Sequence, residues 1–304
     1  MKKEFYSNGK LLITGEYVVL DGAKALALPT RFGQSLIVEE TNGDVIHWQS
    51  FDSDGSIWFE ANIPFDSIIR KERIDLSQNI KNTLIEILHE AYNTNSDFIT
   101  KSKGYKITTQ LTFPKNWGLG TSSTLINNIA QWVNIDAYNL LKNSFGGSGY
   151  DVACASSNSP IIYQLIDEKP TVTSVNFYPD FSKNLYFVYL NQKQNSKNAI
   201  AEYFRNRGDI FKAISKIDKI TDKVATTKNL QEFAKEIELH EIELSNLLSM
   251  STIQETLFSD FDGVVKSLGA WGGDFIMAIS NNNPKKYFEE KGYPIVLEYE
   301  KMIL

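Results

Sequence analysis

The sequence lacks several features that would restrict its function at once. It has one cysteine, Cys154, so no disulfide can form within the chain, and we expect it to reside in a reducing compartment, the cytoplasm. No uncharged apolar run reaches the length of a membrane span. The start has two lysines followed by polar residues, unlike a secretory leader. We therefore expect a cytoplasmic protein with no membrane partner.

Positive charge and histidine are scarce as well. Lysine and arginine number 31 against 37 aspartates and glutamates, which gives a net charge of −6. Nucleic-acid binders usually carry a basic face, so we expect no nucleic-acid partner, although local donors still permit nucleotide binding. His47, His89 and His240 are far apart and lack the spacing of metal ligands, so we interpret them as surface or packing residues.

The familiar nucleotide-binding signatures are also missing. Neither G-x-x-x-x-G-K-[ST] nor G-x-G-x-x-G occurs, and we find no internal repeat, low-complexity tract or heptad run. The chain has 304 residues, of which 42% are hydrophobic and 22% charged. These values are typical of a globular protein with one large domain or two ordinary ones.

Strand and helix patterns are mixed along the chain. Asp54 and Gly55, and likewise Asn42 and Gly43, lie between strand-like runs and each pair predicts a hairpin. From residue 196 to about residue 268 the pattern is mainly helical. The order is not a strict βαβ alternation, so we predict an α+β protein with mixed sheets.

The change from β-rich to helix-rich sequence near residue 180 predicts a domain boundary. We expect an N-terminal domain over residues 1–180 and a C-terminal domain over residues 181–304. No linker composition marks the boundary.

The stretch PKNWGLGTSST, residues 114–124, has the parts of a phosphate cradle. A strand ends at Pro114, and a helix over about residues 122–132 begins among hydroxyl residues. Glycines let the backbone approach a phosphate, the helix start offers free N–H groups, and a serine hydroxyl can bind Mg²⁺. A plain turn with a serine or threonine N-cap is the other interpretation. The predicted nucleotide-binding residues are Gly118, Leu119, Gly120, Thr121, Ser122 and Ser123.

Two further glycine clusters and one lysine have two interpretations each. Asp151 follows a glycine turn at a helix start, where it is either a base in a tight pocket or a favourable charge for the helix dipole. LGAWGGDF, residues 268–275, is either a close-packed turn or a second wall around phosphates. Lys10, which we place in a glycine turn before an apolar strand, either anchors an anion or faces solvent.

Together these features resemble the GHMP kinases, the superfamily of galactokinase, homoserine kinase, mevalonate kinase and phosphomevalonate kinase. GKLLITGEYVVLDG resembles the family's first motif, PKNWGLGTSST the second and KSLGAWGGDFIMAI the third, in family order across nearly the whole chain. GEYVVLDG, GSGYDVA and GGD are most similar to phosphomevalonate kinases, and GGSGYD also resembles a bacterial subgroup with no assigned substrate. The resemblance implies an N-terminal domain like the second domain of ribosomal protein S5 and a ferredoxin-like C-terminal domain.

The resemblance also implies site roles and an ATP-dependent kinase that acts on a small molecule, as a monomer or homodimer. ATP would lie over residues 118–123, with Mg²⁺ at the Ser122 hydroxyl. Asp151 would take or orient the substrate hydroxyl, and Lys10 would lower the pKa of that hydroxyl and steady developing charge. The residues expected to bind substrate are Glu16, Ser148, Lys193, Lys197, Gly272 and Gly273.

The sequence departs from the family pattern at the metal site and in the third motif. Many members have a magnesium-binding glutamate where this chain has residues near Leu140, so either Asp136 substitutes or the metal depends on Ser122 and ATP. Trp271 stands where a glycine is usual, and it either narrows the pocket, stacks on a ligand or packs. The alternatives to a phosphomevalonate or mevalonate kinase are a mevalonate-diphosphate-decarboxylase-like lyase and a non-catalytic nucleotide- or metabolite-binding relative. The presence of both Lys10 and Asp151 argues against the last.

Overall fold

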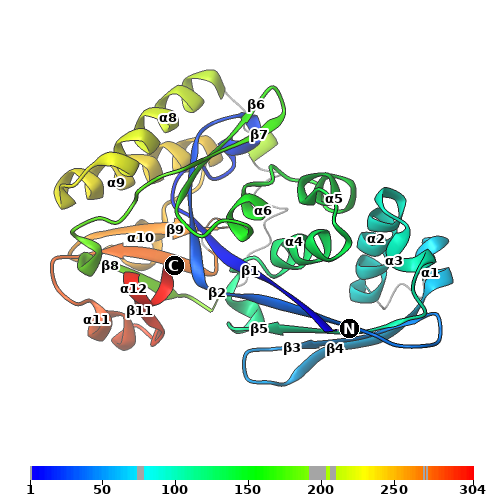
Figure 1. Cartoon of the computed structure of the whole chain (residues 1–304). Coiled ribbons are helices and arrows are strands. Elements are labelled where there is room, and N and C mark those ends of the chain that lie inside the picture. The colour runs from blue at the N-terminus through cyan, green and yellow to red at the C-terminus, as the bar shows by residue number, and fades with distance from the viewer. Residues whose placement is uncertain (1, 74–78, 192–202, 206–209, 270, 272) are drawn as a thin grey trace. The chain divides into compact units, whose positions relative to one another are not determined.

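The chain forms two compact units, each assembled from separate pieces of sequence (Figure 1). The computed structural model describes residues 2–73, 79–191, 203–205, 210–269, 271 and 273–304. The first unit comprises Met1–Gly9, Phe32–Lys115 and Leu119–Ser156. The second comprises Lys10–Arg31, Asn116–Gly118 and Ser157–Leu304. The boundary near residue 180 follows a change in composition, and as a domain boundary it stays a prediction.

The first unit contains a sheet in the order β4-β3-β5-β2, with β1 paired to β2. Only the β3–β5 pair is parallel among the pairs β2–β5, β3–β4 and β3–β5. Its strands, of which β1 and β2 continue into the second unit, are β1 (Lys2–Leu12), β2 (Ala25–Glu40), β3 (Val45–Phe51), β4 (Ile57–Pro64) and β5 (Tyr105–Leu111).

Strand β5 shows how the alternating sequence forms this sheet. Tyr105, Ile107, Thr109 and Leu111 are buried, as a period of two predicts for one covered face. The hairpin predicted at Asp54 and Gly55 is confirmed, because β3 and β4 pair on either side of it. The hairpin predicted at Asn42 and Gly43 is wrong, because β5 pairs with both β2 and β3 and lies between them.

Helices cover one face of this sheet (Figure 1). Ile126 and Ile129 of α4 pack with Leu36, Trp48 and Ile107 of the strands in one apolar core. The helices of the first unit are α1 (Phe65–Ile69), α2 (Asn79–Thr94), α3 (Asp97–Thr100), α4 (Thr121–Val133), α5 (Ala137–Ser144) and α6 (Tyr150–Ala155), and the 3₁₀ turn η2 (Lys115–Trp117) precedes α4.

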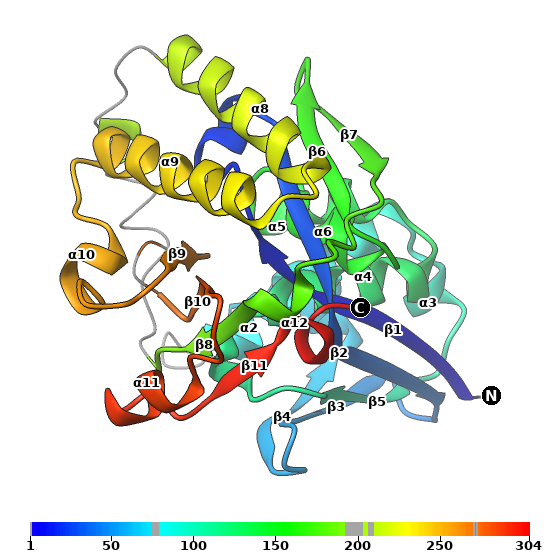
Figure 2. The same cartoon turned by 90° about the vertical axis from the view of Figure 1, so that its left-hand side faces the viewer.

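The second unit has its own antiparallel sheet in the order β11-β8-β10-β9. Helices α8 and α9 lie side by side in both views (Figures 1 and 2). In this unit the first residues of β2 also pair with β6, and β6 pairs with β7. Its strands are β6 (Ile161–Ile166), β7 (Lys169–Ser174), β8 (Leu185–Tyr189), β9 (Val264–Leu268), β10 (Phe275–Ile279) and β11 (Val296–Glu298). Its helices are α8 (Ile210–Thr226), α9 (Leu230–Leu248), α10 (Ile253–Leu257), α11 (Lys285–Glu290) and α12 (Tyr299–Met302), with 3₁₀ turns η1 (Val18–Asp21) and η3 (Ser182–Asn184).

The two sheets with their helices confirm the predicted α+β class. The first sheet is mixed, as predicted, whereas the second is entirely antiparallel. One element differs from the sequence interpretation. The helical pattern extended to about Leu268, but Val264–Leu268 is strand β9, which pairs with β10 through Leu268 and Phe275. The β-branched Val264 and Val265 favour a strand, and the hairpin partner β10 stabilises it. Among the described helices, none is both long and apolar enough to cross a bilayer.

Candidate functional site

The start of α4 carries the predicted phosphate cradle. Gly120 occupies the N-cap position with a left-handed backbone, φ 96°, and as a glycine it has no side chain to cap the helix. Ser122 is exposed, whereas Ser123 is buried and its hydroxyl donates to the Gly120 carbonyl at 2.9 Å. A helix start capped this way leaves first-turn N–H groups for an anion. Ser122, not Ser123, has the hydroxyl that solvent reaches.

Buried polar side chains fix α4 within the first unit. The Asn128 amide donates to the Gln34 carbonyl at 2.9 Å, and the Thr124 hydroxyl donates to the Gln34 side-chain oxygen at 2.8 Å. The Ser7 hydroxyl donates to Asn128 Oδ1 at 2.7 Å and accepts from the Asn127 amide at 2.8 Å. These bonds join the helix to β1 and β2, so the first turn of α4 has a rigid support.

Asp151 and Asp136 act on a common neighbour, Tyr138. Asp151 is half-buried in the first turn of α6, after Gly149 with φ 90°. Burial, together with the negative charges of Asp136 and Asp151, raises the pKa of the Tyr138 phenol to about 12. The first unit therefore brings these two predicted site residues near one tyrosine, which the sequence reasoning missed. Ser148 is half-buried in the loop that leads into α6.

Asp136 also has a structural role. It is the N-cap of α5, where its Oδ1 accepts the N–H of Asn139 at 2.7 Å. Leu140, near the place of the family glutamate, is 2% exposed and belongs to the apolar core. Within the described part of the chain, no three His, Cys, Asp or Glu side chains converge as a metal site. Oxygen donors suit Mg²⁺, and Ser122 offers one, while Asp136 retains Oδ2 beyond its cap bond.

Lys10 is half-buried and lies in the last part of strand β1, which belongs to the second unit. The predicted glycine turn around it is wrong, because the strand runs through Gly9 and Lys10 to Leu12. Lys10 and Asp151 belong to different units, so a joint site for them stays a prediction.

Gly118 meets an acidic side chain of the second unit. A Cβ built on Gly118 would lie 1.9 Å from Asp274 Oδ2, and its φ is +67°. Both facts require glycine here. The neighbouring Trp117 packs on Tyr189 and Phe275, with ring centroids 5.9 and 5.4 Å away. The close contact between Gly118 and Asp274 therefore lies beside an aromatic cluster of Trp117, Tyr189 and Phe275.

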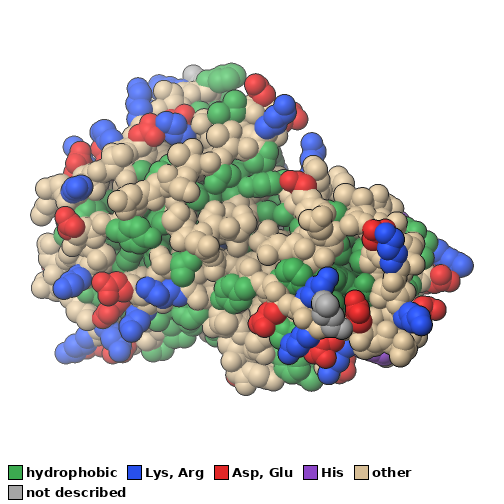
Figure 3. Space-filling view, in the orientation of Figure 1, with side chains coloured by type: hydrophobic (Ala, Val, Ile, Leu, Met, Phe, Trp, Pro, Cys, Tyr) green, Lys and Arg blue, Asp and Glu red, His purple; other side chains and the backbone are tan. Residues whose placement is uncertain are grey.

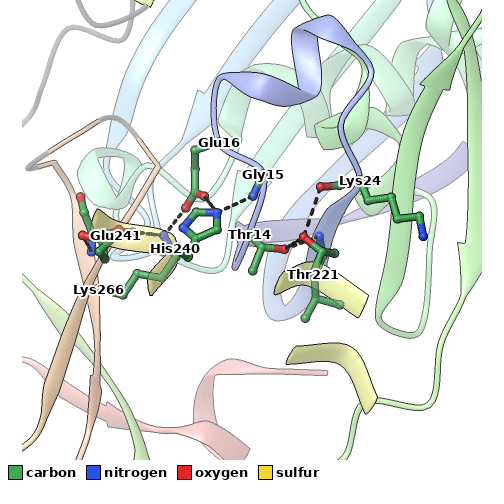
Figure 4. Close-up of polar contacts among 10 residues, drawn as sticks. Thr14, Gly15, Glu16, Lys24, Thr221, His240, Glu241 and Lys266 are labelled. Atoms are coloured by element: carbon green, nitrogen blue, oxygen red, sulfur yellow. Dashed lines mark hydrogen bonds and ion pairs between the residues drawn. The ribbon is translucent and has the colours of Figure 1, made fainter. Parts of the chain in front are cut away.

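Glu16 belongs to a buried charge cluster with His240, Glu241 and Lys266 (Figure 4). Lys266 Nζ donates to Glu16 Oε1 at 2.7 Å and to Glu241 Oε1 at 3.1 Å. Glu241 Oε2 also accepts the N–H of Ser267 at 3.1 Å. The substrate-binding role of Glu16 stays a prediction, while these contacts give its carboxylate a structural role inside the second unit.

Two polar atoms of the buried charge cluster have no hydrogen-bond partner among the described residues. His240 Nε2 accepts the N–H of Gly15 at 2.9 Å, so the neutral ring carries its proton on Nδ1, which is one of the two. The other is Glu16 Oε2, which lies 3.5 Å from His240 Nε2. Burial and then the charge of Lys266 hold the pKa of His240 well below its usual value, and burial raises the pKa of Glu16 and of Glu241. The sequence showed only an isolated histidine and a lysine before a glycine cluster.

The third motif begins in β9 and ends in β10. Trp271 is 7% exposed, and its indole N–H donates to the Ser251 carbonyl at 3.0 Å. Its backbone N–H donates to the Tyr17 hydroxyl at 2.7 Å. Of the three interpretations of Trp271, these contacts support packing. Gly273 is buried, whereas Gly272, Lys193 and Lys197 lie outside the described residues.

Charged side chains of both signs mix on the outer helices of the second unit. Over α8, α9 and α11, the face in Figure 3 shows lysines and arginines next to aspartates and glutamates. Several form exposed pairs, such as Lys216 with Glu243 at 2.6 Å and Lys285 with Glu289 at 3.8 Å. That face therefore presents no single sign of charge.

Comparison with known proteins gives a fold and no sequence relative. No protein-family model matches the chain, and no curated protein sequence does. The structure is similar to mevalonate kinase of Methanococcus jannaschii, with TM-score 0.70 and 18% identity over 98% of this chain and 96% of that one. It is similar to Streptococcus pneumoniae phosphomevalonate kinase in complex with phosphomevalonate and AMPPNP, with TM-score 0.71 and 14% identity over 97% and 99%. Lactococcus lactis galactokinase complexed with galactose gives TM-score 0.66 and 14% identity over 98% and 92%. The chain therefore has the two-domain fold of the GHMP kinases, as its three motifs predict.

Proposed function

We propose that the chain is an ATP-dependent kinase that transfers the γ-phosphoryl group to a small metabolite. The observation that carries this proposal is the start of α4, where a left-handed glycine caps the helix and Ser122 is exposed beside it. Phosphoryl transfer depends on positioning and charge neutralisation, and a rigid helix start supplies both to a phosphate chain.

The proposed substrate is phosphomevalonate or mevalonate. GEYVVLDG and GGD resemble phosphomevalonate kinases, and structures of both kinds of kinase have this fold. Galactokinase shares the fold too, so the fold alone supports a small-molecule kinase. The proposed substrate depends on the sequences of the motifs.

The proposed residue roles follow motif positions. The N–H groups of residues 118–123 hold the nucleotide phosphates. Asp151 takes or orients the proton of the acceptor group, and Lys10 neutralises charge as the phosphoryl group moves. Mg²⁺, when bound at the Ser122 hydroxyl, neutralises phosphate charge. Lys10 belongs to the second unit and Asp151 to the first.

The test is ADP formation from ATP and Mg²⁺ with a panel of acceptors: mevalonate, phosphomevalonate, diphosphomevalonate, homoserine and simple sugars. Asp151→Asn serves as the blank because it removes the proposed base and keeps the shape. An acceptor-dependent signal absent from the blank supports the kinase and names its substrate class.

Two other results identify the alternatives. Carbon dioxide released together with ADP from diphosphomevalonate would support the decarboxylase-like lyase. Nucleotide binding by a protein that turns over no acceptor, and whose Asp151→Asn variant behaves identically, would support a non-catalytic binding protein.

A further inference from the structure

The buried charge cluster connects three segments that are far apart in the sequence. Glu16 lies in the first motif, His240 and Glu241 lie on α9, and Lys266 lies on β9 as the first residue of the third motif. Gly15 and His240 are 225 residues apart, and Lys266 is 250 residues from Glu16. All of these residues belong to the second unit. The cluster therefore ties the segment after Lys10 to the strand that enters the third motif.

Gly15 is held in a backbone conformation that other residues avoid. Its φ is +89°, and a Cβ there would lie 2.6 Å from the Lys24 carbonyl oxygen. Its N–H has His240 Nε2 as acceptor (Figure 4). The segment is thus pressed against β2 on one side and hydrogen-bonded to α9 on the other.

The preceding residue is fixed by a different helix. The Thr221 hydroxyl of α8 donates to Thr14 Oγ1 at 2.8 Å, and Thr14 Oγ1 also accepts the N–H of Leu26 at 3.1 Å. Consecutive residues 14, 15 and 16 therefore contact α8, α9 and β9 in turn (Figure 4). Each contact is a directional polar bond, which fixes position more narrowly than apolar packing does.

Stability alone does not account for this arrangement. Buried ion pairs are often replaceable by apolar side chains of similar volume without loss of stability, because desolvation offsets their attraction. Here Lys266 is fully buried between two carboxylates, and two polar atoms of the cluster find no hydrogen-bond partner in the part of the chain that the structure describes. The polar bonds instead restrict the conformation of residues 14–16, which contact α8, α9 and β9.

We propose that His240 and Lys266 are positioning residues that hold residues 14–16, a few residues after Lys10, in the conformation that phosphoryl transfer requires. The catalytic consequence rests on the proposed kinase function. The conformational part can be measured without any substrate.

The experiment is hydrogen exchange at the Gly15 amide of the full chain, combined with ADP kinetics. His240→Leu removes the acceptor, whereas His240→Gln places an amide oxygen near the position of Nε2. The control is Glu236→Gln, another buried glutamate of α9, 4% exposed, which binds Lys223 of α8 at 2.7 Å.

We expect His240→Leu to speed exchange at Gly15 by about tenfold or more, because the amide loses its acceptor. His240→Gln should restore most of the protection, and Glu236→Gln should leave it unchanged. If the kinase function holds, kcat should fall in His240→Leu with the KM for ATP unchanged, and should recover in His240→Gln.

Unchanged exchange at Gly15 in His240→Leu would overturn the proposal. Two further results would also overturn it: in His240→Leu, exchange that speeds up equally at the amides of β8 and β10, or exchange at Gly15 that speeds up as much in Glu236→Gln. Either result would indicate a general loss of stability in the second unit. A wild-type protein that forms no ADP with any acceptor would remove the proposed reaction, and the exchange result would still decide the positioning.

Discussion

Asp136 combines a helix cap with a predicted metal site, and two substitutions separate these roles. Asn is as good an N-cap as Asp, so Asp136→Asn should keep the free energy of unfolding, whereas Asp136→Ala should lower it by about 1 kcal/mol. We expect both variants to raise the Mg²⁺ concentration for half-maximal rate, since both remove the charge. Denaturant titration and a magnesium titration measure the two effects. An unaltered magnesium titration would assign the metal to Ser122 and the nucleotide.

His240 should make the protein sensitive to mild acid. Its pKa is well below 6.5 when folded and near 6.5 when unfolded, so below pH 6.5 the unfolded chain binds the extra proton. The free energy of unfolding should therefore fall as the pH drops through this window. Burial raises the pKa of Glu16 and of Glu241 above 4.5, so these carboxyls act in the opposite direction. Their contribution to the free energy of unfolding rises as the pH falls through the raised folded pKa values toward 4.5.

The histidine contribution appears as a difference between wild type and His240→Gln. Between pH 7.5 and 5.5, wild type should lose about 1.4 kcal/mol more than the variant in urea unfolding. The same loss in both proteins would contradict a buried neutral His240.

Lys266 offers a third test at the residue scale. Lys266→Met leaves Glu16 and Glu241 buried without their counter-charge, and we expect a loss of about 3–5 kcal/mol in the free energy of unfolding. The matched control is Lys216→Met, whose ammonium is exposed in its pair with Glu243 and should matter by less than about 1 kcal/mol. Equal losses in thermal or urea unfolding would show that the buried pairs contribute no more than the exposed one.

At the scale of elements, the entrance to α4 depends on glycine for two separate reasons. Gly118 and Gly55 both have left-handed φ, +67° and +82°, but a Cβ on Gly55 meets nothing within 4 Å. Gly118→Ala should therefore be more destabilising than Gly55→Ala by about 1–3 kcal/mol, the range for overpacking, because the new methyl group displaces Asp274. It should also weaken nucleotide binding, measured by calorimetry, while Gly55→Ala should not. Equal affinities in the two variants would separate Gly118 from the nucleotide site.

The sequence predicts elements well where local pattern and tertiary context agree. Strand β5 and helices α4 and α6 follow from alternation and from glycine-to-helix transitions. The hairpin prediction at Asn42 and Gly43 is wrong because β5, some 60 residues later in the sequence, lies between β2 and β3. A local turn signal does not encode such a distant pairing. The helix predicted up to about Leu268 is wrong at Val264–Leu268, because the pairing of β9 with β10 overrides the helical pattern of the sequence.

The candidate site also has features that the local sequence predicts and features that only the folded chain creates. Glycine turns and helix starts at residues 118–123 and at Asp151 are local, and their predicted conformations hold. The buried charge cluster is not local, since His240 and Lys266 acquire partners only through folding. Isolated in the sequence, each looked like an ordinary residue. The catalytic roles themselves stay predictions.

At the scale of the whole molecule, the second unit needs residues 10–31 as well as residues 157–304. A fragment of residues 181–304, cut at the composition change, lacks Glu16 for Lys266 and lacks β6 and β7. We expect it to show no cooperative thermal transition by circular dichroism, whereas the full chain should show one. The same fragment unfolding cooperatively would support residue 180 as a true domain boundary.

The distance in sequence between Gly15 and His240 also determines the order in which the two partners leave the ribosome. The ribosome makes the first motif early, but its acceptor on α9 emerges 225 residues later. At about 5–20 residues per second, the segment waits roughly 10 to 45 seconds for its partner. Helix α4 and the strands that it packs on, by contrast, are all synthesised within the first 156 residues. The nascent chain therefore completes the fold around α4 while its own first motif is still without the residues that hold it.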